Sequence, residues 1–172
     1  DEPFGELQQL IAGVRLVREV SVRVRVRIMA LGELMATRLG AAYLRQRGLD
    51  VSWVDARDCL VSRDQLTADR ERNYLAAVCD YGYDAGFAAR LDRYPGVVLT
   101  QGFIARNDQG ETVLLGRGGS DTSASYIASR LNARRLEIWT DVPGMFTADP
   151  RVVPSARLLV ALRYDEAQEL AS

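Results

Sequence analysis

The sequence predicts an α/β layered domain, because short apolar strand-like runs alternate along the chain with helical patterns. Apolar residues recur at helical spacing over Phe4–Val17 and Leu31–Arg47. Apolar runs bounded by turn residues, at Val51–Val54, Val97–Ala105 and Leu136–Thr140, predict strands between such helices. The 172 residues suffice for a sizeable core, and no internal repeat or interdomain linker divides them.

The stretch Val20–Ile28 allows two predictions. Valine and arginine alternate there, which favours a strand whose three arginines form a solvated face. A helix is the alternative, because Ser21 is a suitable N-cap and the helical pattern of Leu31–Arg47 follows, closed by Gly48.

The same patterns predict the other elements. In chain order they are a loop at 56–67, helices at Ala68–Cys79 and Asp84–Leu91, the strand Val97–Ala105, a turn at 107–110, a strand at Glu111–Leu115 that makes a hairpin with it, a helix at Thr122–Leu131, the strand Leu136–Thr140, a loop at 141–154, a short strand near Leu158–Leu162 and a helical pattern from Tyr164.

Composition argues against several classes of function. The net charge of −1 provides no global basic field for nucleic acid. No apolar run approaches the roughly 18 residues of a membrane span, and the N-terminal sequence is not a signal peptide, so we expect a cytoplasmic protein. Cys59 and Cys79 are too few for a disulfide framework and indicate reduced thiols.

Two residue types are missing altogether. The chain has no histidine, which removes the usual zinc ligand and the usual base of a serine or cysteine triad. All 22 basic residues are arginine, and none is lysine. Any phosphate clamp within these residues is therefore arginine, backbone N–H or metal.

A glycine-rich loop, Gly116-Arg-Gly-Gly-Ser-Asp121, lies between a predicted strand and a predicted helix. Its three glycines let successive N–H groups form an anion-binding nest, to which the positive end of the helix adds. Arg117 adds a planar fork suited to a carboxylate or a phosphate. A structural turn, with Asp121 as a plain N-cap, is the alternative.

A second polar set follows the predicted strand that ends at Thr140. Thr140 and Asp141 come at its carboxyl end, where open α/β sheets bind ligands. Turns at Pro143-Gly144 and at Asp149-Pro-Arg151 predict that two carboxylates and an arginine share one rim. A bland surface loop is the alternative.

In order and spacing, these motifs resemble those of aspartate kinases in the amino-acid kinase superfamily. The runs that carry the resemblance are Ile28-Met-Ala-Leu-Gly-Glu-Leu34, Thr100-Gln-Gly-Phe-Ile-Ala105, Gly116-Arg-Gly-Gly-Ser-Asp121, Glu137-Ile-Trp-Thr-Asp-Val-Pro-Gly144, Thr147-Ala-Asp-Pro-Arg-Val-Val-Pro154, and Tyr164-Asp-Glu-Ala167 with Glu169-Leu-Ala171. The likeness is strongest from residue 97 onward. It implies an incomplete three-layer α/β/α sandwich of the amino-acid (carbamate) kinase type, with a helix over Val20–Ile28.

The resemblance implies ATP-dependent phosphorylation of the side-chain carboxylate of L-aspartate to 4-phospho-L-aspartate, the first step of lysine, threonine and methionine biosynthesis. The expected cofactors are ATP and Mg²⁺ carried by the nucleotide, in a homo-oligomer without nucleic-acid or membrane partners and without a metal site of its own. Because the aspartate side chain is already ionised at neutral pH, the reaction needs no general base, and the missing histidine is no objection.

The resemblance also implies roles for individual residues. Glu33 would help to hold the amino acid. Without the resemblance, a glutamate near a helix start is weak evidence for a binding role, because it interacts favourably with the helix dipole anyway. The predicted aspartate and phosphate loop is Arg117, Gly118, Gly119 and Ser120, with Arg117 gripping a substrate carboxylate and Asp121 orienting the loop or the substrate ammonium. The predicted nucleotide contacts are Thr140, Asp141, Phe146 and Arg151. The family usually has tyrosine where this chain has Phe146, so a hydroxyl contact to the nucleotide is lost.

Three parts of the family have no counterpart in these 172 residues: a Lys-Phe-Gly-Gly-Thr-Ser strand and loop, a later Gly-Ala-Lys segment, and the regulatory ACT domains. The resemblance thus implies that residues 1–172 are the central and C-terminal part of the catalytic domain, inactive alone without the two lysines. A fusion to another biosynthetic enzyme is compatible with it. Two alternatives stay open: a kinase for glutamate, acetylglutamate or UMP, and a non-catalytic regulatory or scaffolding copy of the fold.

Overall fold

The computed structural model describes residues 2–63 and 69–170, which form two compact units, Asp1–Leu136 and Glu137–Ser172. Each unit is described by itself. In the described part of the chain, no helix combines the length and the apolarity needed to cross a bilayer.

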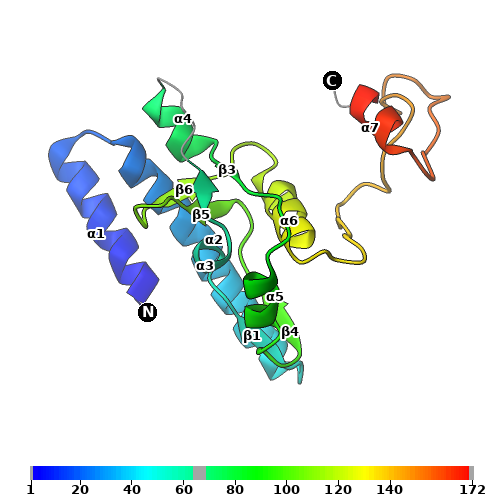
Figure 1. Cartoon of the computed structure of the whole chain (residues 1–172). Helices are drawn as coiled ribbons and strands as arrows, with labels where there is room; N and C mark the ends of the chain where they lie inside the picture. The colour runs from blue at the N-terminus through cyan, green and yellow to red at the C-terminus, as the bar shows by residue number, and fades with distance from the viewer. Residues whose placement is uncertain (1, 64–68, 171–172) are drawn as a thin grey trace. The chain divides into compact units, whose positions relative to one another are not determined.

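The first unit begins with a hairpin of two helices, α1 (Glu2–Val17) and α2 (Val22–Gln46) (Figure 1). The alternating stretch is therefore a helix, and the strand alternative is wrong. Ser21 caps it by accepting a hydrogen bond from the Val24 N–H, and Gly48 follows its end at φ +86°.

The arginines of the alternating stretch explain why it resembled a strand. Each of them reaches a carboxylate outside α2: Arg23 contacts Glu111, Arg25 contacts Glu71 and Arg27 contacts Glu6. The buried residues of α2 instead recur at helical intervals; they are Val26, Ala30, Leu31, Leu34 and Ala41. A helical apolar stripe thus underlies the apparent alternation.

Three two-stranded pairs follow the hairpin of helices. β1 (Val51–Trp53) is parallel to β4 (Val97–Leu99), β2 (Ser62–Arg63) is antiparallel to β3 (Val78–Cys79), and β5 (Ile104–Arg106) is antiparallel to β6 (Thr112–Leu114). The predicted hairpin is confirmed as β5–β6. The predicted single strand Val97–Ala105 is wrong, because residues 100–103 separate β4 from β5.

The shorter helices are α3 (Ala56–Cys59), α4 (Arg70–Leu75), α5 (Ala85–Leu91) and α6 (Gly119–Arg130). The predicted loop at 56–67 is wrong where α3 and β2 form, and residues 64–67 lie outside the described residues. The predicted helix Ala68–Cys79 is wrong after Leu75, because the Ala77 N–H bonds the Leu114 carbonyl, 2.8 Å away, and β3 then pairs with β2. Its first residue, Ala68, also lies outside the described residues.

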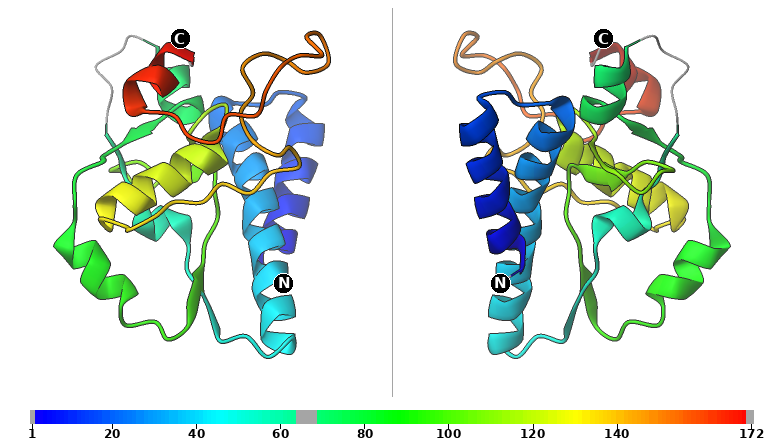
Figure 2. Two further views of the ribbon diagram at one scale, coloured as in Figure 1. Left: turned by 90° about the vertical axis from the view of Figure 1, so that its right-hand side faces the viewer. Right: turned by 90° about the vertical axis from the view of Figure 1, so that its left-hand side faces the viewer.

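The β5–β6 hairpin is buried on both faces, with α1 and α2 on one side and α5 and α6 on the other (Figure 2). On the α2 side the core joins Val26, Ala30, Leu31, Leu34, Ala56, Ile104 and Leu114. On the other side it joins Val54, Cys59, Leu60, Ala77, Cys79, Phe87, Ala105, Val113, Leu115 and Tyr126. Helices, strands and helices thus form three layers.

The second unit contains α7 (Tyr164–Leu170), which confirms the terminal helical pattern. The strands predicted at Leu136–Thr140 and near Leu158–Leu162 are wrong, since no described strand pairs with either run. A single antiparallel bridge joins Phe146 to Leu158. Trp139 is 89% exposed and Val160 95% exposed, so apolar sequence alone did not produce a ladder here.

We predict that both cysteines react slowly in the folded protein. Burial raises the pKa of the Cys59 and Cys79 thiols to about 11, so roughly one thiol in a thousand is ionised at pH 8. We expect labelling with a thiol-specific disulfide reagent to be about 100-fold slower than in urea, where both thiols return to their ordinary pKa. Fast labelling of the native protein would contradict the burial of these side chains.

Candidate functional site

A tight glycine turn connects β6 to α6. Gly116 has φ +77° and Gly118 has φ +67°, conformations that residues with a Cβ rarely adopt. Gly118 is the N-cap of α6, so the helix begins at Gly119, earlier than the predicted Thr122. The alternative that Asp121 is a plain N-cap is wrong: Asp121 is the third helical residue, exposed in the first turn, where a carboxylate interacts favourably with the helix dipole.

The turn directs backbone donors toward the start of α6. The Gly119 N–H is taken up by the Gly116 carbonyl at 3.1 Å, and the Thr122 N–H bonds the Gly118 carbonyl at 2.9 Å. The N–H groups of Ser120 and Asp121 lie between these two bonds, in the first helical turn, which lacks intrahelical acceptors. The sequence thus builds a positive helix end next to Arg117, an arrangement suited to an anion.

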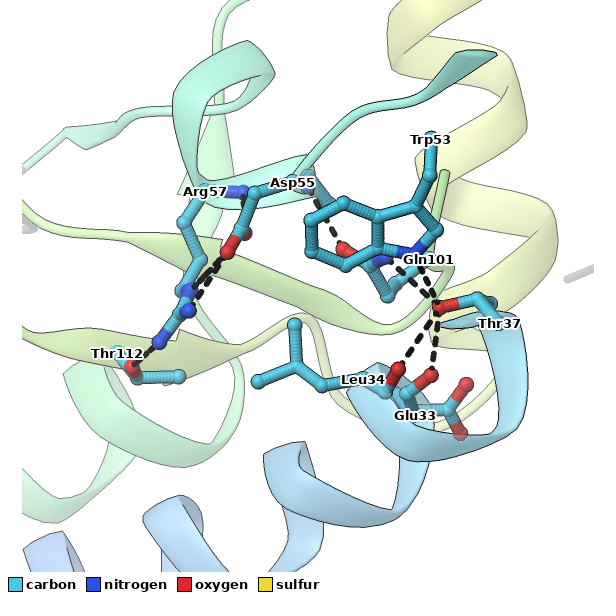
Figure 3. A network of polar contacts seen from close by, with 9 residues as sticks. Glu33, Leu34, Thr37, Trp53, Asp55, Arg57, Gln101 and Thr112 are labelled. Carbon is cyan, nitrogen blue, oxygen red and sulfur yellow. Dashed lines mark hydrogen bonds and ion pairs between the residues drawn. The ribbon is translucent and has the colours of Figure 1, made fainter. Parts of the chain in front are cut away.

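Arg117 and Glu33 are two of the predicted charges of the first unit, and in the described part of the chain neither has an ion-pair partner. Arg117 is exposed and has no ion-pair partner among residues 2–63 and 69–170. Glu33 lies half-buried on α2, and within the same residues no partner reaches its carboxylate; Figure 3 shows bonding only at its backbone carbonyl. A free guanidinium and a free carboxylate are what a zwitterionic amino acid requires.

Residues 100–103 connect the Glu33 helix to the glycine turn. A Cβ on Gly102 would lie 2.8 Å from the Ser120 Cα, so the two backbones are nearly in contact. The next residue, Phe103, has φ +71° and donates its N–H to the Ser123 Oγ at 2.8 Å and to the Gly119 carbonyl at 3.2 Å. This segment therefore fixes the start of α6.

On its other side the same segment reaches α2. Gln101 is 1% exposed and donates from Nε2 to the Thr37 Oγ1, 2.8 Å away. Thr37 lies one turn after Glu33 and donates to the Glu33 carbonyl at 2.8 Å (Figure 3). The structure thus links Glu33 with the turn formed by residues 117–120. Our residue-level predictions missed Gln101 and Gly102, although a polar Thr-Gln-Gly inside an apolar run was a usable signal.

An ion pair holds α3 close to this network. Asp55 caps α3 by accepting from the Arg57 N–H at 2.9 Å, and its carboxylate contacts the Arg57 guanidinium at 2.6 Å. Burial alone would raise the pKa of Asp55, but the hydrogen bonds and charge of Arg57 outweigh it and hold that pKa below its usual value. Arg57 also donates to the Thr112 Oγ1 at 3.1 Å, which ties α3 to β6 (Figure 3).

The predicted nucleotide residues lie in the second unit. Thr140 and Asp141 are exposed, and the Thr140 hydroxyl donates to the Asp141 carboxylate at 3.2 Å. Thr140 lines a shallow hollow of about 520 Å³ formed by 137–140 and 142–144, whereas Asp141, Phe146 and Arg151 are not among its lining residues.

The second predicted turn of this unit is present. The Arg151 N–H bonds the Asp149 carboxylate at 2.9 Å, and its Nε lies 3.4 Å from the same oxygen. Among the described residues no interaction joins this pair to Asp141. The meeting of the acidic segment 140–151 with the glycine turn in one cleft stays a prediction.

Helices on both faces of short strands, with a glycine turn that presents an arginine at a helix start, define an α/β domain whose glycine turn has the geometry of an anion site. The sequence model of the amino acid kinase family matches residues 6–172. The chain therefore belongs to the amino acid kinase family, and its incomplete three-layer sandwich is the fold of that family.

Two relatives and one solved structure illustrate the match. The chain is 36% identical to lysine-sensitive aspartokinase 3 of Escherichia coli K12, over 97% of this chain and 37% of that protein. It is 43% identical to bifunctional aspartokinase/homoserine dehydrogenase 2 of the same organism, over 81% of this chain and 16% of that protein. The crystal structure of E. coli aspartokinase III in complex with aspartate and ADP, in its R-state, superposes with a TM-score of 0.76 at 35% identity, covering 97% of this chain and 37% of that one. The chain thus spans little more than a third, or less, of these proteins.

We predict that the same substitution has opposite effects at two glycines. Gly102→Ala places a Cβ 2.8 Å from backbone and should lower the free energy of unfolding by about 1–3 kcal/mol. Gly32→Ala is the control, because an added Cβ there has no atom within 4 Å, in the middle of α2. It should raise that free energy by up to about 1 kcal/mol. Urea unfolding of both variants checks this, and equal effects would contradict the close approach at Gly102.

Proposed function

We propose that the intact protein containing this chain transfers the γ-phosphate of ATP to the side-chain carboxylate of L-aspartate, forming 4-phospho-L-aspartate at the entry to lysine, threonine and methionine biosynthesis. The observation that carries this is Arg117 on the glycine turn at the start of α6, which has no ion-pair partner in the part of the chain that the structure describes. Residues 100–103 link this turn to the Glu33 helix. The similarity to aspartokinases, one of them bound to aspartate and ADP, supports the choice of substrate.

The residues of the first unit suit the amino-acid side of this reaction. Arg117 binds a substrate carboxylate through its planar fork, and Glu33 attracts the ammonium. The N–H groups of Ser120 and Asp121 stabilise the negative charge on the phosphoryl group in the transition state of its transfer. The aspartate carboxylate, already ionised, attacks the γ-phosphorus, and the bond between that phosphorus and the ADP oxygen breaks. Alignment and charge neutralisation then supply most of the rate enhancement.

The second unit supplies the nucleotide side. Thr140 and Asp141 are the polar contacts of the nucleotide, with Arg151 close to its phosphates and Phe146 packing or stacking where the resembling family has tyrosine. Mg²⁺ arrives on the nucleotide phosphates, with which it keeps most of its ligands.

Further parts complete the proposed enzyme. Residues 1–172 are the central and C-terminal part of its catalytic domain, and two phosphate-contacting lysines come from segments outside them, as do ACT domains. The enzyme works in the cytoplasm as a homo-oligomer. The absence of lysine from these 172 residues accords with this division of the site.

Arg117 provides the first test. In the intact protein, Arg117→Ala should lower kcat/KM for aspartate by about 10²–10³-fold, because a charged donor to the substrate is lost. Arg117→Lys should recover part of this, since it restores the charge without the bidentate fork. Arg93→Ala is the matched control, an exposed arginine beyond α5, and should leave the kinetics unchanged. Wild-type kinetics in Arg117→Ala would refute the assignment.

The lysines outside the chain provide a second test. We expect the 172-residue chain alone to release ADP at least about 10²-fold more slowly than the intact protein, because phosphate-clamping charges are missing. A coupled ADP-release assay with aspartate compares the two, and robust turnover by the chain alone would contradict the proposal. Glutamate, acetylglutamate and UMP in the same assay test the other kinases. Loss of every activity in the intact protein would favour a scaffolding copy, which the Phe146 departure motivates.

A further inference from the structure

Among the side-chain amides that the structure describes in the first unit, that of Gln101 is the most deeply buried, and the proposed chemistry does not use it. It is 1% exposed, and both ends of the amide have partners: Oε1 accepts from the Ala56 N–H at 2.8 Å, and Nε2 donates to the Thr37 Oγ1 at 2.8 Å. Because a backbone N–H can only donate, it must face the amide oxygen, and the NH₂ group must therefore face Thr37. The amide thus has one allowed orientation.

The hydroxyl of Thr37 has no spare hydrogen-bonding capacity. Its oxygen accepts from Gln101 Nε2 and from Trp53 Nε1, 3.1 Å away, so both acceptor positions are used. Its single hydrogen then points into α2, where the Glu33 carbonyl lies at 2.8 Å and that of Leu34 at 3.3 Å (Figure 3). Each hydrogen bond in this series therefore has a fixed donor: Gln101 donates to Thr37, and Thr37 donates to the helical turn that carries Glu33.

On the other side, the backbone next to Gln101 is fixed to α6. Gly102 faces Ser120 without room for a Cβ, and a Cβ on Gly119 would lie 2.5 Å from the Phe103 ring. A movement of Gln101 therefore displaces the first turn of α6, and the residue that precedes this turn's cap is Arg117.

We propose that Gln101 is a positioning residue that sets the spacing between Glu33 and the Arg117 turn, with the Thr37 hydroxyl as its relay. This inference rests on the proposed function, since Glu33 and Arg117 are the groups that hold aspartate. Gln101 itself touches no substrate. Its effect is on the affinity for aspartate, because a misplaced ion-pair fork loses its bidentate geometry. ATP is held by the second unit and is not affected through this path.

The test is a set of variants of the intact protein, assayed for the KM values of aspartate and of ATP. Gln101→Met and Thr37→Val remove the bonds with little change of volume and should raise the KM for aspartate by roughly tenfold or more while the KM for ATP stays within about twofold. Thr37→Ser keeps the hydroxyl and should restore the wild-type value. Thr112→Val is the matched control, because it removes a hydroxyl from the neighbouring Arg57 contact without touching Gln101.

The outcomes separate the possibilities. A fall in melting temperature with an unchanged KM for aspartate, or an equal rise in both KM values, would show a merely structural amide and overturn the inference. If Gln101→Met does not fold, the comparison of the KM for aspartate between Thr37→Val and Thr37→Ser decides the question. Failure of the wild-type protein to phosphorylate aspartate refutes the proposed function first and the inference with it, whereas an active wild type with unaffected variants refutes the inference alone.

Discussion

The first unit depends on the β5–β6 hairpin being buried on both of its faces. Ile104 and Leu114 belong to the core on the α2 side, and Ala105 and Val113 to the core on the α5 and α6 side. An isolated two-stranded hairpin is marginal in water, so these two cores are what make the hairpin a rigid frame. The chain enters β5 from residues 100–103 and leaves β6 into the glycine turn. The segment that bonds α2 and the turn that carries Arg117 are thus the two chain segments that flank this hairpin.

A second constraint acts where these ends meet. Gly102 and Gly119 bring two backbone segments closer than any Cβ would allow. The close approach requires Phe103 to adopt a left-handed conformation, which costs a bulky residue about 1–3 kcal/mol. That conformation aims the Phe103 N–H at the carbonyl of Gly119 and the hydroxyl of Ser123. Strain of this kind persists only where surrounding contacts over-determine it. Here it orients the first turn of α6, and the positive helix end is held in place before any anion arrives.

Features set by local chemistry could be predicted from the sequence, and features set by distant partners could not. The glycine turn, the hairpin and α5 follow from turn residues and caps close by in the chain. The helix predicted to continue to Cys79 instead ends at Leu75, because the Ala77 N–H finds the carbonyl of Leu114 in β6. The break between β4 and β5 likewise depends on Ser120, since only the close approach of α6 requires Gly102 there.

The two halves of the proposed site differ in how their residues are held. The amino-acid half is fixed by tertiary bonds, in which the buried Gln101, the Thr37 hydroxyl and the Phe103 N–H each have assigned partners. Within the described residues of the second unit, the side chain of Thr140 bonds only its neighbour Asp141, and that of Arg151 bonds only Asp149, two residues away. Bonds between residues one or two positions apart fix the local turn, but they do not fix how the turn packs against the rest of the protein. Preorganisation lowers the entropic cost of aligning a nucleophile, and in the proposed enzyme it belongs to the residues proposed to bind the carboxylate. In the proposed enzyme, the amino-acid half would discriminate among acceptors by rigid geometry, and the binding of the nucleotide would order the residues of the second unit.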